Sequence, residues 1–107
     1  MPPIPIIPRY KLLVKFDIQP EQYEPYYRYI LGEFIPGLQA MQLYPFMVWH
    51  IAYGNYPIRQ LEFVVENLDI IKDAFESENW KTLEERLKSY TLNYERKVVP
   101  FKDRFQF

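Results

Sequence analysis

The chain has 107 residues, enough for one domain with its own core, and 49% of them are apolar, so it is neither disordered nor embedded in a membrane. Its formal net charge of −1 is too balanced for a nucleic-acid binder, which usually carries a clustered basic excess. It has no cysteine, which excludes disulfides and thiolate chemistry, and its 19% aromatic content indicates an aromatic core or a surface covered by another chain or a ligand.

The first nine residues form a proline-rich arm. Four prolines among residues 1–8 fix φ and remove amide donors, so we expect an extended segment that either lies on a surface or hangs free as a tail. The arm lacks a basic n-region, and its prolines interrupt the apolar run that a secretory signal needs. No apolar run in the chain approaches the roughly 20 residues that cross a bilayer. By elimination we expect a cytoplasmic protein.

A strand and a helix follow the arm. Alternation over Tyr10–Ile18 predicts the strand, with Leu12, Val14 and Phe16 on its inner face. Tyr23–Ile35 has a helical rhythm, and Pro25 favours a helix that begins at Glu24 or Pro25. The predicted buried stripe of this helix is Tyr23, Tyr27, Ile30, Leu31 and Phe34. Pro36 and Gly37 are expected to end it.

Phe46–Tyr53 and Leu61–Glu66 predict a second and a third strand, joined into a hairpin by the turn signal Gly54-Asn55-Tyr56-Pro57. The second strand is apolar on both faces: Phe46, Val48, His50 and Ala52 share one face, and Met47, Trp49, Ile51 and Tyr53 share the other. The third strand places Leu61, Phe63 and Val65 inward and Gln60, Glu62, Val64 and Glu66 outward. A strand without a wet side predicts a partner that covers the sheet.

A second helical region is predicted in two pieces, Asp69–Phe75 and a new start with Ser77 as N-cap. Its second piece should bury Trp80, Leu83, Leu87 and Tyr90. Asn93–Val99 predicts the fourth strand, and Pro100 ends it. The tail Phe101–Phe107 has three phenylalanines, so we expect it to dock.

This β-α-β-β-α-β order predicts an α+β, ferredoxin-like fold with a four-stranded antiparallel sheet, in which residues 1–107 form a single domain. Over Tyr10–Val99 the chain resembles the dimeric α+β barrel superfamily, most clearly at Gly54–Pro57, Ser77–Trp80 and Asn93–Val99. The resemblance is to members of unknown function. It implies a homodimer whose sheets pack face to face across a two-fold axis, and a site between sheet and helices. Some members are cofactor-free monooxygenases, but the first strand here has no asparagine, and its polar residues include Lys15 and Asp17.

Candidate site residues are few. His50, the only histidine, is a possible general base, with a buried neutral imidazole as the alternative, and Tyr27 could orient a substrate. Trp49, Trp80, Tyr23, Phe34 and Phe63 could line a ligand pocket, although such residues more often form a core or an interface. One histidine without cysteine argues against a structural zinc site, and no cofactor-binding motif is present, so we expect neither metal nor cofactor.

The strand-borne charges are Asp17, Arg59, Glu62 and Glu66, which would pair across a dimer or mark a site if they faced the barrel. We interpret Arg59 and Glu62 as edge charges that limit sheet growth. The predicted function is binding of a small apolar or aromatic molecule between sheet and helices. One alternative is a cofactor-independent enzyme (monooxygenase, isomerase or decarboxylase type) that acts on an aromatic or polyketide-like substrate. A purely structural dimer is the other.

Overall fold

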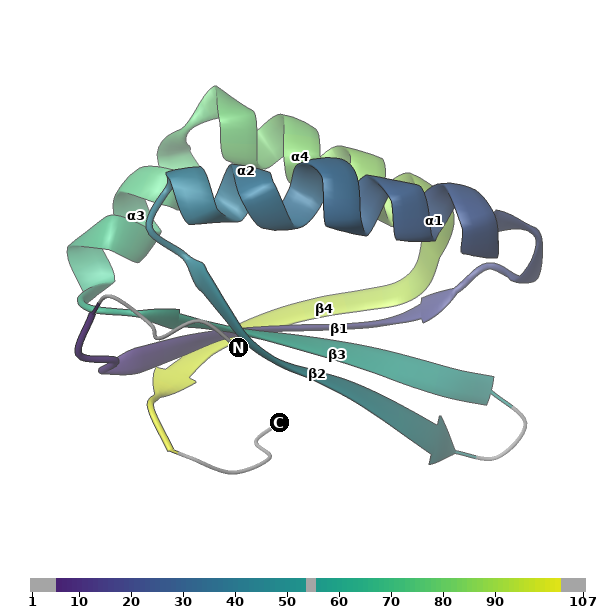
Figure 1. Cartoon of the computed structure of the whole chain (residues 1–107), viewed down its shortest axis with the longest axis horizontal. Helices are drawn as coiled ribbons and strands as arrows, with labels where there is room; N and C mark the ends of the chain where they lie inside the picture. The colour runs from purple at the N-terminus through teal and green to yellow at the C-terminus, as the bar shows by residue number, and fades with distance from the viewer. Residues whose placement is uncertain (1–5, 54–55, 103–107) are drawn as a thin grey trace.

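The computed structural model describes residues 6–53 and 56–102, and for residues 50–53 and 56–58 it describes the backbone alone. Four strands form one sheet in the order β2-β3-β1-β4: β1 Tyr10–Ile18, β2 Tyr44–Tyr53, β3 Tyr56–Val65 and β4 Thr91–Pro100. All three neighbouring pairs are antiparallel, and Tyr53 lies opposite Tyr56, so the predicted hairpin is confirmed. The prediction that Tyr56 and Pro57 belong to the turn was wrong, because the ladder between β2 and β3 continues to the pair of Tyr53 and Tyr56. The other two predicted turn residues, Gly54 and Asn55, lie outside the described residues. The helices cover one face of the sheet (Figure 1), which confirms the α+β, ferredoxin-like prediction.

The core lies between the sheet and the helices, as the alternation in the strands predicts. Leu12, Val14, Phe16 and Ile18 of β1 and Leu61, Phe63 and Val65 of β3 are buried there. Their side chains alternate with residues on the opposite face because successive Cβ atoms of a strand point to opposite sides. That opposite face, which we call the helix-free face, carries Lys11, Leu13 and Lys15 of β1.

The first helical region is longer than predicted. A 3₁₀ turn, η1 Pro20–Gln22, leads into α1 Tyr23–Tyr29, a π-helical turn η2 Ile30–Phe34, and α2 Ile35–Ala40. The prediction that Pro36 and Gly37 end the helix was wrong. Pro36 follows the π turn, whose wider backbone relieves the clash that a proline ring makes with the carbonyl four residues earlier in a regular helix.

Gly37 has a packing role inside α2. A Cβ atom built at Gly37 would lie 2.7 Å from Leu83 Cδ1, so the missing side chain lets α2 approach the opposite helix closely. The helix ends at Ala40 instead, where Gln42 adopts a left-handed φ of 66° and the Leu43 amide donates to the Leu38 carbonyl at 2.9 Å. This is a Schellman-type end without its usual glycine, which explains why the sequence pattern did not indicate it.

The second helical region has the predicted break. It consists of α3 Leu68–Glu76 and α4 Glu78–Tyr90, and the Ser77 hydroxyl caps α4 by accepting a hydrogen bond from the Trp80 amide at 3.1 Å. Trp80 and Leu87 are buried, and Leu83 and Tyr90 pack against the core, so the predicted stripe is confirmed. No helix within the described part of the chain is long and apolar enough to span a membrane.

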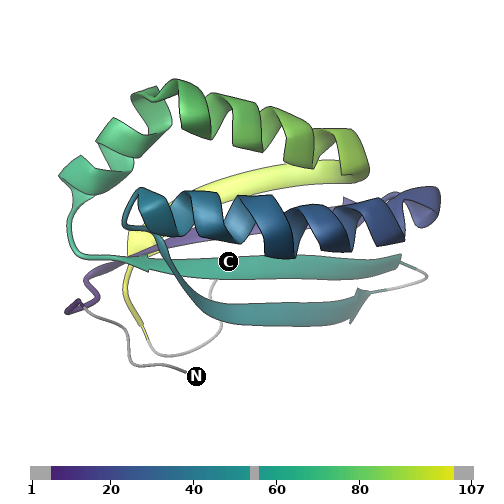
Figure 2. The same ribbon diagram turned by 45° about the horizontal axis from the view of Figure 1, so that its top comes forward.

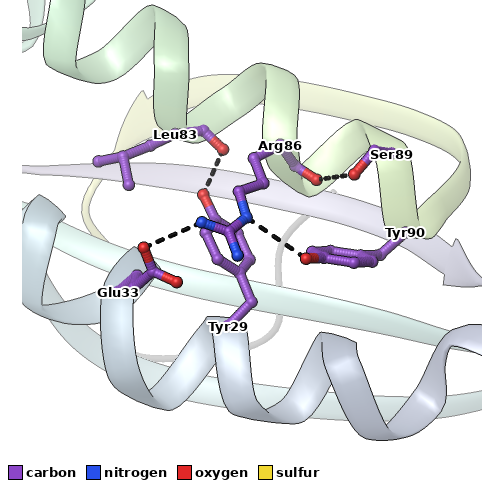
Figure 3. Close-up of polar contacts among 6 residues, drawn as sticks. All are labelled: Tyr29, Glu33, Leu83, Arg86, Ser89 and Tyr90. Carbon is purple, nitrogen blue, oxygen red and sulfur yellow. Dashed lines mark hydrogen bonds and ion pairs between the residues drawn. The ribbon is translucent and has the colours of Figure 1, made fainter.

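Polar contacts join the two helical regions (Figure 3). The Tyr29 hydroxyl donates to the Leu83 carbonyl at 2.5 Å, and the Arg86 guanidinium pairs with Glu33 at 3.1 Å and donates from Nε to the Tyr90 hydroxyl at 3.3 Å. Tyr29 is buried, and the loss of solvent raises the pKa of its phenol well above the usual range. Tyr29 therefore stays protonated and acts as a fixed donor between α1 and α4.

A β-bulge in β2 changes which side chains share a face. The register with β3 shifts between Pro45 and Met47, so Phe46 is the extra residue. Phe46 lies beside Lys11, and Trp49 contacts Glu62, which puts both aromatic residues on the helix-free face. The prediction that Phe46 and Trp49 occupy opposite faces was wrong, because an extra residue reverses the alternation after it.

Arg9, just before β1, and Phe101, just after β4, are joined by a backbone hydrogen bond. The Arg9 amide donates to the Val65 carbonyl at 3.0 Å, and the Phe101 amide donates to the Arg9 carbonyl at 2.9 Å. Phe101 packs edge-on against Phe46, with ring centroids 5.4 Å apart, so the start of the C-terminal tail docks as predicted. The remainder of that tail, residues 103–107, and residues 1–5 of the arm lie outside the described residues.

Candidate functional site

The most exposed apolar residues of the first helical region lie along one stripe. Tyr23, Tyr27 and Leu31 follow one another at four-residue spacing, and their exposed fractions are 37%, 41% and 70%. Of the predicted buried stripe, Ile30 and Phe34 are buried as expected, and the prediction was wrong for Tyr23, Tyr27 and Leu31. The helical region also buries Tyr26, Tyr29 and Leu38, because the neighbouring stripe faces the sheet.

Tyr27 meets an arginine from the sheet. Arg59 of β3 is half-buried, its guanidinium lies 5.5 Å from the centroid of the Tyr27 ring, and it donates a hydrogen bond to the Tyr27 hydroxyl oxygen. The ring of Tyr26 packs edge-on at 5.2 Å behind Tyr27. Burial raises the pKa of Tyr26 well above its usual range, and the positive charge of Arg59 opposes that rise in part.

The helix-facing side of the sheet has an exposed apolar residue on β2, one of its two outer strands. Val48 of β2 pairs with the inward-facing Leu61, so it lies on the helix-facing side, yet it is 57% exposed. In both ribbon views α1, η2 and α2 run along the β2–β3 side of the helix layer, and α4 runs along the other side (Figures 1 and 2). We call Tyr23, Tyr27, Leu31, Val48 and Arg59 the edge patch.

His50 pairs with Arg59 through the backbone of β2 and β3. Its side chain lies outside the part of the chain that the structure describes, so its role as a base stays a prediction. Arg59 itself was interpreted as an edge charge, and that interpretation was wrong, because β3 is an inner strand between β2 and β1. A sequence signal did exist, since an arginine on an inward-facing position of a strand needs a specific partner.

Three predicted ligand-binding residues lie together in the core. Phe34, Phe63 and Trp80 are at most 1% exposed, and the Phe34 ring lies 6.1 Å from that of Phe63 and 6.4 Å from that of Trp80. Arg96 of β4 stacks over Trp80 and the adjacent Phe75. In this arrangement the three residues pack on one another as part of the core.

Trp49 belongs to a different group, on the helix-free face. Its indole nitrogen donates to Glu62 Oε2, as does Gln60 Nε2 at 3.1 Å, and Lys11 Nζ pairs with Glu62 Oε1 at 2.8 Å. Lys11 also lies 5.2 Å from the Phe46 ring centroid. We call Lys11, Trp49, Gln60 and Glu62 the buried ion-pair cluster.

The buried ion-pair cluster corrects the interpretation of Glu62 as an edge charge. Glu62 is 1% exposed on an inner strand, and Lys11 and Gln60 are fully buried. A buried carboxylate is retained when cations and N–H donors surround it, and here both carboxylate oxygens have such partners. Because Lys11, Gln60 and Glu62 are closed to solvent, we assign the cluster to the packing of the sheet and not to a ligand.

Other cavities lie away from these residues. One of about 380 Å³ is lined by Arg9, Tyr10 and residues 66–69, and another of about 230 Å³ is lined by Met41, Gln42, Ile70, Asp73, Ala74 and Ser77. Neither is lined by a residue predicted to bind a ligand. Within the described residues, no group of three or more histidine, cysteine, aspartate or glutamate side chains is placed to hold a metal ion.

Solved structures share this fold at low sequence identity. A NIPSNAP family protein from Agrobacterium tumefaciens superposes with a TM-score of 0.66 at 13% identity, covering 89% of this chain and 87% of its own. An ethyl tert-butyl ether D (EthD) family protein from Bacillus halodurans gives 0.62 at 13% identity, with 85% and 96% covered. A protein from Bacteroides fragilis, described as dimeric, of unknown function and ferredoxin-like, gives 0.56 at 14% identity, with 87% and 96% covered.

These likenesses show the fold and agree with the fold-level resemblance predicted from the sequence. No protein-family model matches the chain, and no curated protein matches it. The chain is therefore a ferredoxin-like protein whose function has to be argued from its own side chains.

Proposed function

We propose that this chain forms a homodimer and binds a small apolar or aromatic molecule at the edge patch, between the helix layer and β2. The observation that carries the proposal is the exposed stripe Tyr23, Tyr27 and Leu31, on the helical region that runs along the β2–β3 side of the sheet, together with the exposed Val48 of β2. Apolar residues that gather on one surface in this way favour a bound molecule or partner, because burying them removes apolar area from water.

The edge patch supports a ligand better than the core does. Phe34, Phe63 and Trp80 already fill their space, so a ligand there would have to displace packed rings. Trp49 is held by Glu62 on the opposite face of the sheet. Of the predicted residues whose side chains the structure describes, Tyr23 and Tyr27 are the most exposed.

A structure-based reason also favours binding over catalysis. An enzyme of the predicted cofactor-independent type needs an acid–base pair at the ligand. The edge patch supplies the hydroxyls of Tyr23 and Tyr27 and one cation, Arg59, whose guanidinium donates hydrogen bonds and accepts none. The described groups therefore recognise and orient a molecule.

The test is a titration with a neutral aromatic probe, 2-naphthamide, followed by ¹H–¹⁵N chemical shifts. We expect the amides around Tyr27 and Leu31 to shift, and Leu31→Glu to weaken binding at least severalfold because it puts a charge into the apolar stripe. Leu68→Glu is the matched control, since Leu68 is a similarly exposed leucine (50%) on α3. If nothing binds, or if both variants bind like the wild type, the edge patch is not a ligand site.

A further inference from the structure

Arg59 differs from the arginines of the helices and of β4 in its surroundings. Arg28, Arg86 and Arg96 each form an ion pair with a glutamate. Within the described residues, the Arg59 guanidinium has no carboxylate within ion-pair distance, and its contacts are the Tyr27 ring and hydroxyl. It is half-buried on the helix-facing side of an inner strand, opposite Phe16.

A half-buried cation without a counter-ion has lost part of its hydration, and no ion pair compensates for that loss. The ring of Tyr27 compensates in part, because a guanidinium is attracted to an aromatic face. An anion at the surface of the edge patch would compensate further, and Arg presents several N–H donors in a planar fork suited to a carboxylate.

Tyr27 adds a second donor at the same place. Its hydroxyl oxygen accepts the hydrogen bond from Arg59, so its own proton points elsewhere, and no acceptor for that proton lies among the described residues. The phenol and the guanidinium therefore form two adjacent donors, matching the two oxygens of one carboxylate. The apolar stripe Tyr23, Tyr27 and Leu31 continues from this point along the helix.

We infer that the edge patch selects aromatic carboxylic acids, with Arg59 and the Tyr27 hydroxyl binding the carboxylate and the apolar stripe covering the ring. The inference rests on the proposed function, since it names the ligand class of the same site. Arg59 and Tyr27 act as binding residues, and neither is assigned a chemical step.

The test compares two probes with the same ring system, 2-naphthoate and its neutral amide 2-naphthamide, by calorimetry or NMR titration. For the wild type we expect naphthoate to bind about tenfold more tightly or better, because hydrogen bonds to charged groups are the strong ones. In Arg59→Gln the preference should disappear while the affinity for naphthamide is retained. Tyr27→Phe should lose part of the preference.

Controls separate binding from folding. Arg28→Gln removes an exposed arginine on the same helix as Tyr27 and should leave the preference unchanged. Arg59→Lys keeps the charge without the fork and should keep part of the preference, which covers the case in which Arg59→Gln folds poorly by circular dichroism. Equal binding of both probes to the wild type would overturn this inference and leave the proposed function standing. Binding of neither probe would overturn both.

Discussion

At the scale of single residues, the helix-free face of the sheet buries two charged side chains and one amide. Lys11, Gln60 and Glu62 alternate with core residues along β1 and β3, which suggests a wet face, yet they are buried. Their burial is tolerated because the carboxylate of Glu62 takes the Lys11 ammonium on one oxygen and N–H donors on the other. Which polar residues are partners depends on cross-strand register, and Trp49 reaches Glu62 only because of the bulge at Phe46.

The buried ion-pair cluster makes a prediction about stability. Glu62→Ala removes the carboxylate from the buried Lys11, so we expect the free energy of unfolding to fall by about 3–5 kcal/mol. The double variant Lys11→Met/Glu62→Leu replaces the pair by apolar side chains and should recover most of that loss. Urea denaturation measures both.

The exposed pair Arg28–Glu24 supplies the control for this prediction. Its atoms are 3.5 Å apart and largely in solvent, so Glu24→Ala should change the free energy of unfolding by less than about 1 kcal/mol. If Glu62→Ala lowered the free energy of unfolding as little as Glu24→Ala does, the buried pair would contribute no more to stability than the exposed pair.

At the scale of elements, the first helical region shows how two stripes of similar polarity compete. Tyr23, Tyr27 and Leu31 form one apolar stripe, and Tyr26, Ile30 and Phe34 form its neighbour. Tyrosine occurs on both the buried and the solvent-exposed face of a helix, because it has an apolar ring and a polar hydroxyl. Periodicity alone therefore cannot rank the stripes, and the π turn that shifts the phase leaves no mark in the pattern.

The end of this helix allows a direct test. Gln42 has a φ of 66°, a conformation that costs a residue with a Cβ atom about 1 kcal/mol or more relative to glycine. Gln42→Gly should therefore raise the free energy of unfolding by about 0.5–1 kcal/mol. Gln39→Gly, three residues earlier within α2, is the matched control and should lower it by a similar amount. The Tm of each variant is measured by thermal unfolding. A Gln42→Gly variant with a lower Tm than the wild type would contradict the assigned helix end.

At the scale of the whole molecule, the two faces of the sheet have different roles. The helix layer covers one face and leaves the edge patch exposed, and the centre of the helix-free face is already buried within one chain at Leu13 and Val64. The outer strands still carry exposed apolar residues on that side. Met47 of β2 lies on the helix-free face, because it pairs with Glu62. Leu92 of β4 lies on the same face, because it pairs with Asp17, and it is 51% exposed.

These outer residues locate the proposed dimer contact. We expect the wild type to have about twice the 13.1 kDa chain mass in light scattering, and Leu92→Glu to shift it toward the monomer because it places a charge in the contact. Leu68→Glu, on the helix layer, should leave the mass unchanged. A wild-type protein that is monomeric at micromolar concentration would remove the dimer from the proposed function.

The sequence by itself determined the order of the elements and the inner faces of β1 and β3, because the periods of strands and helices differ and are visible in one dimension. It also determined the cap at Ser77, a local interaction over three residues. The tertiary structure alone decided the helix stripe that faces the sheet, the bulge at Phe46 and the partners of Arg59 and Glu62. Each of these depends on residues brought together from distant parts of the chain, so no local pattern carries the information.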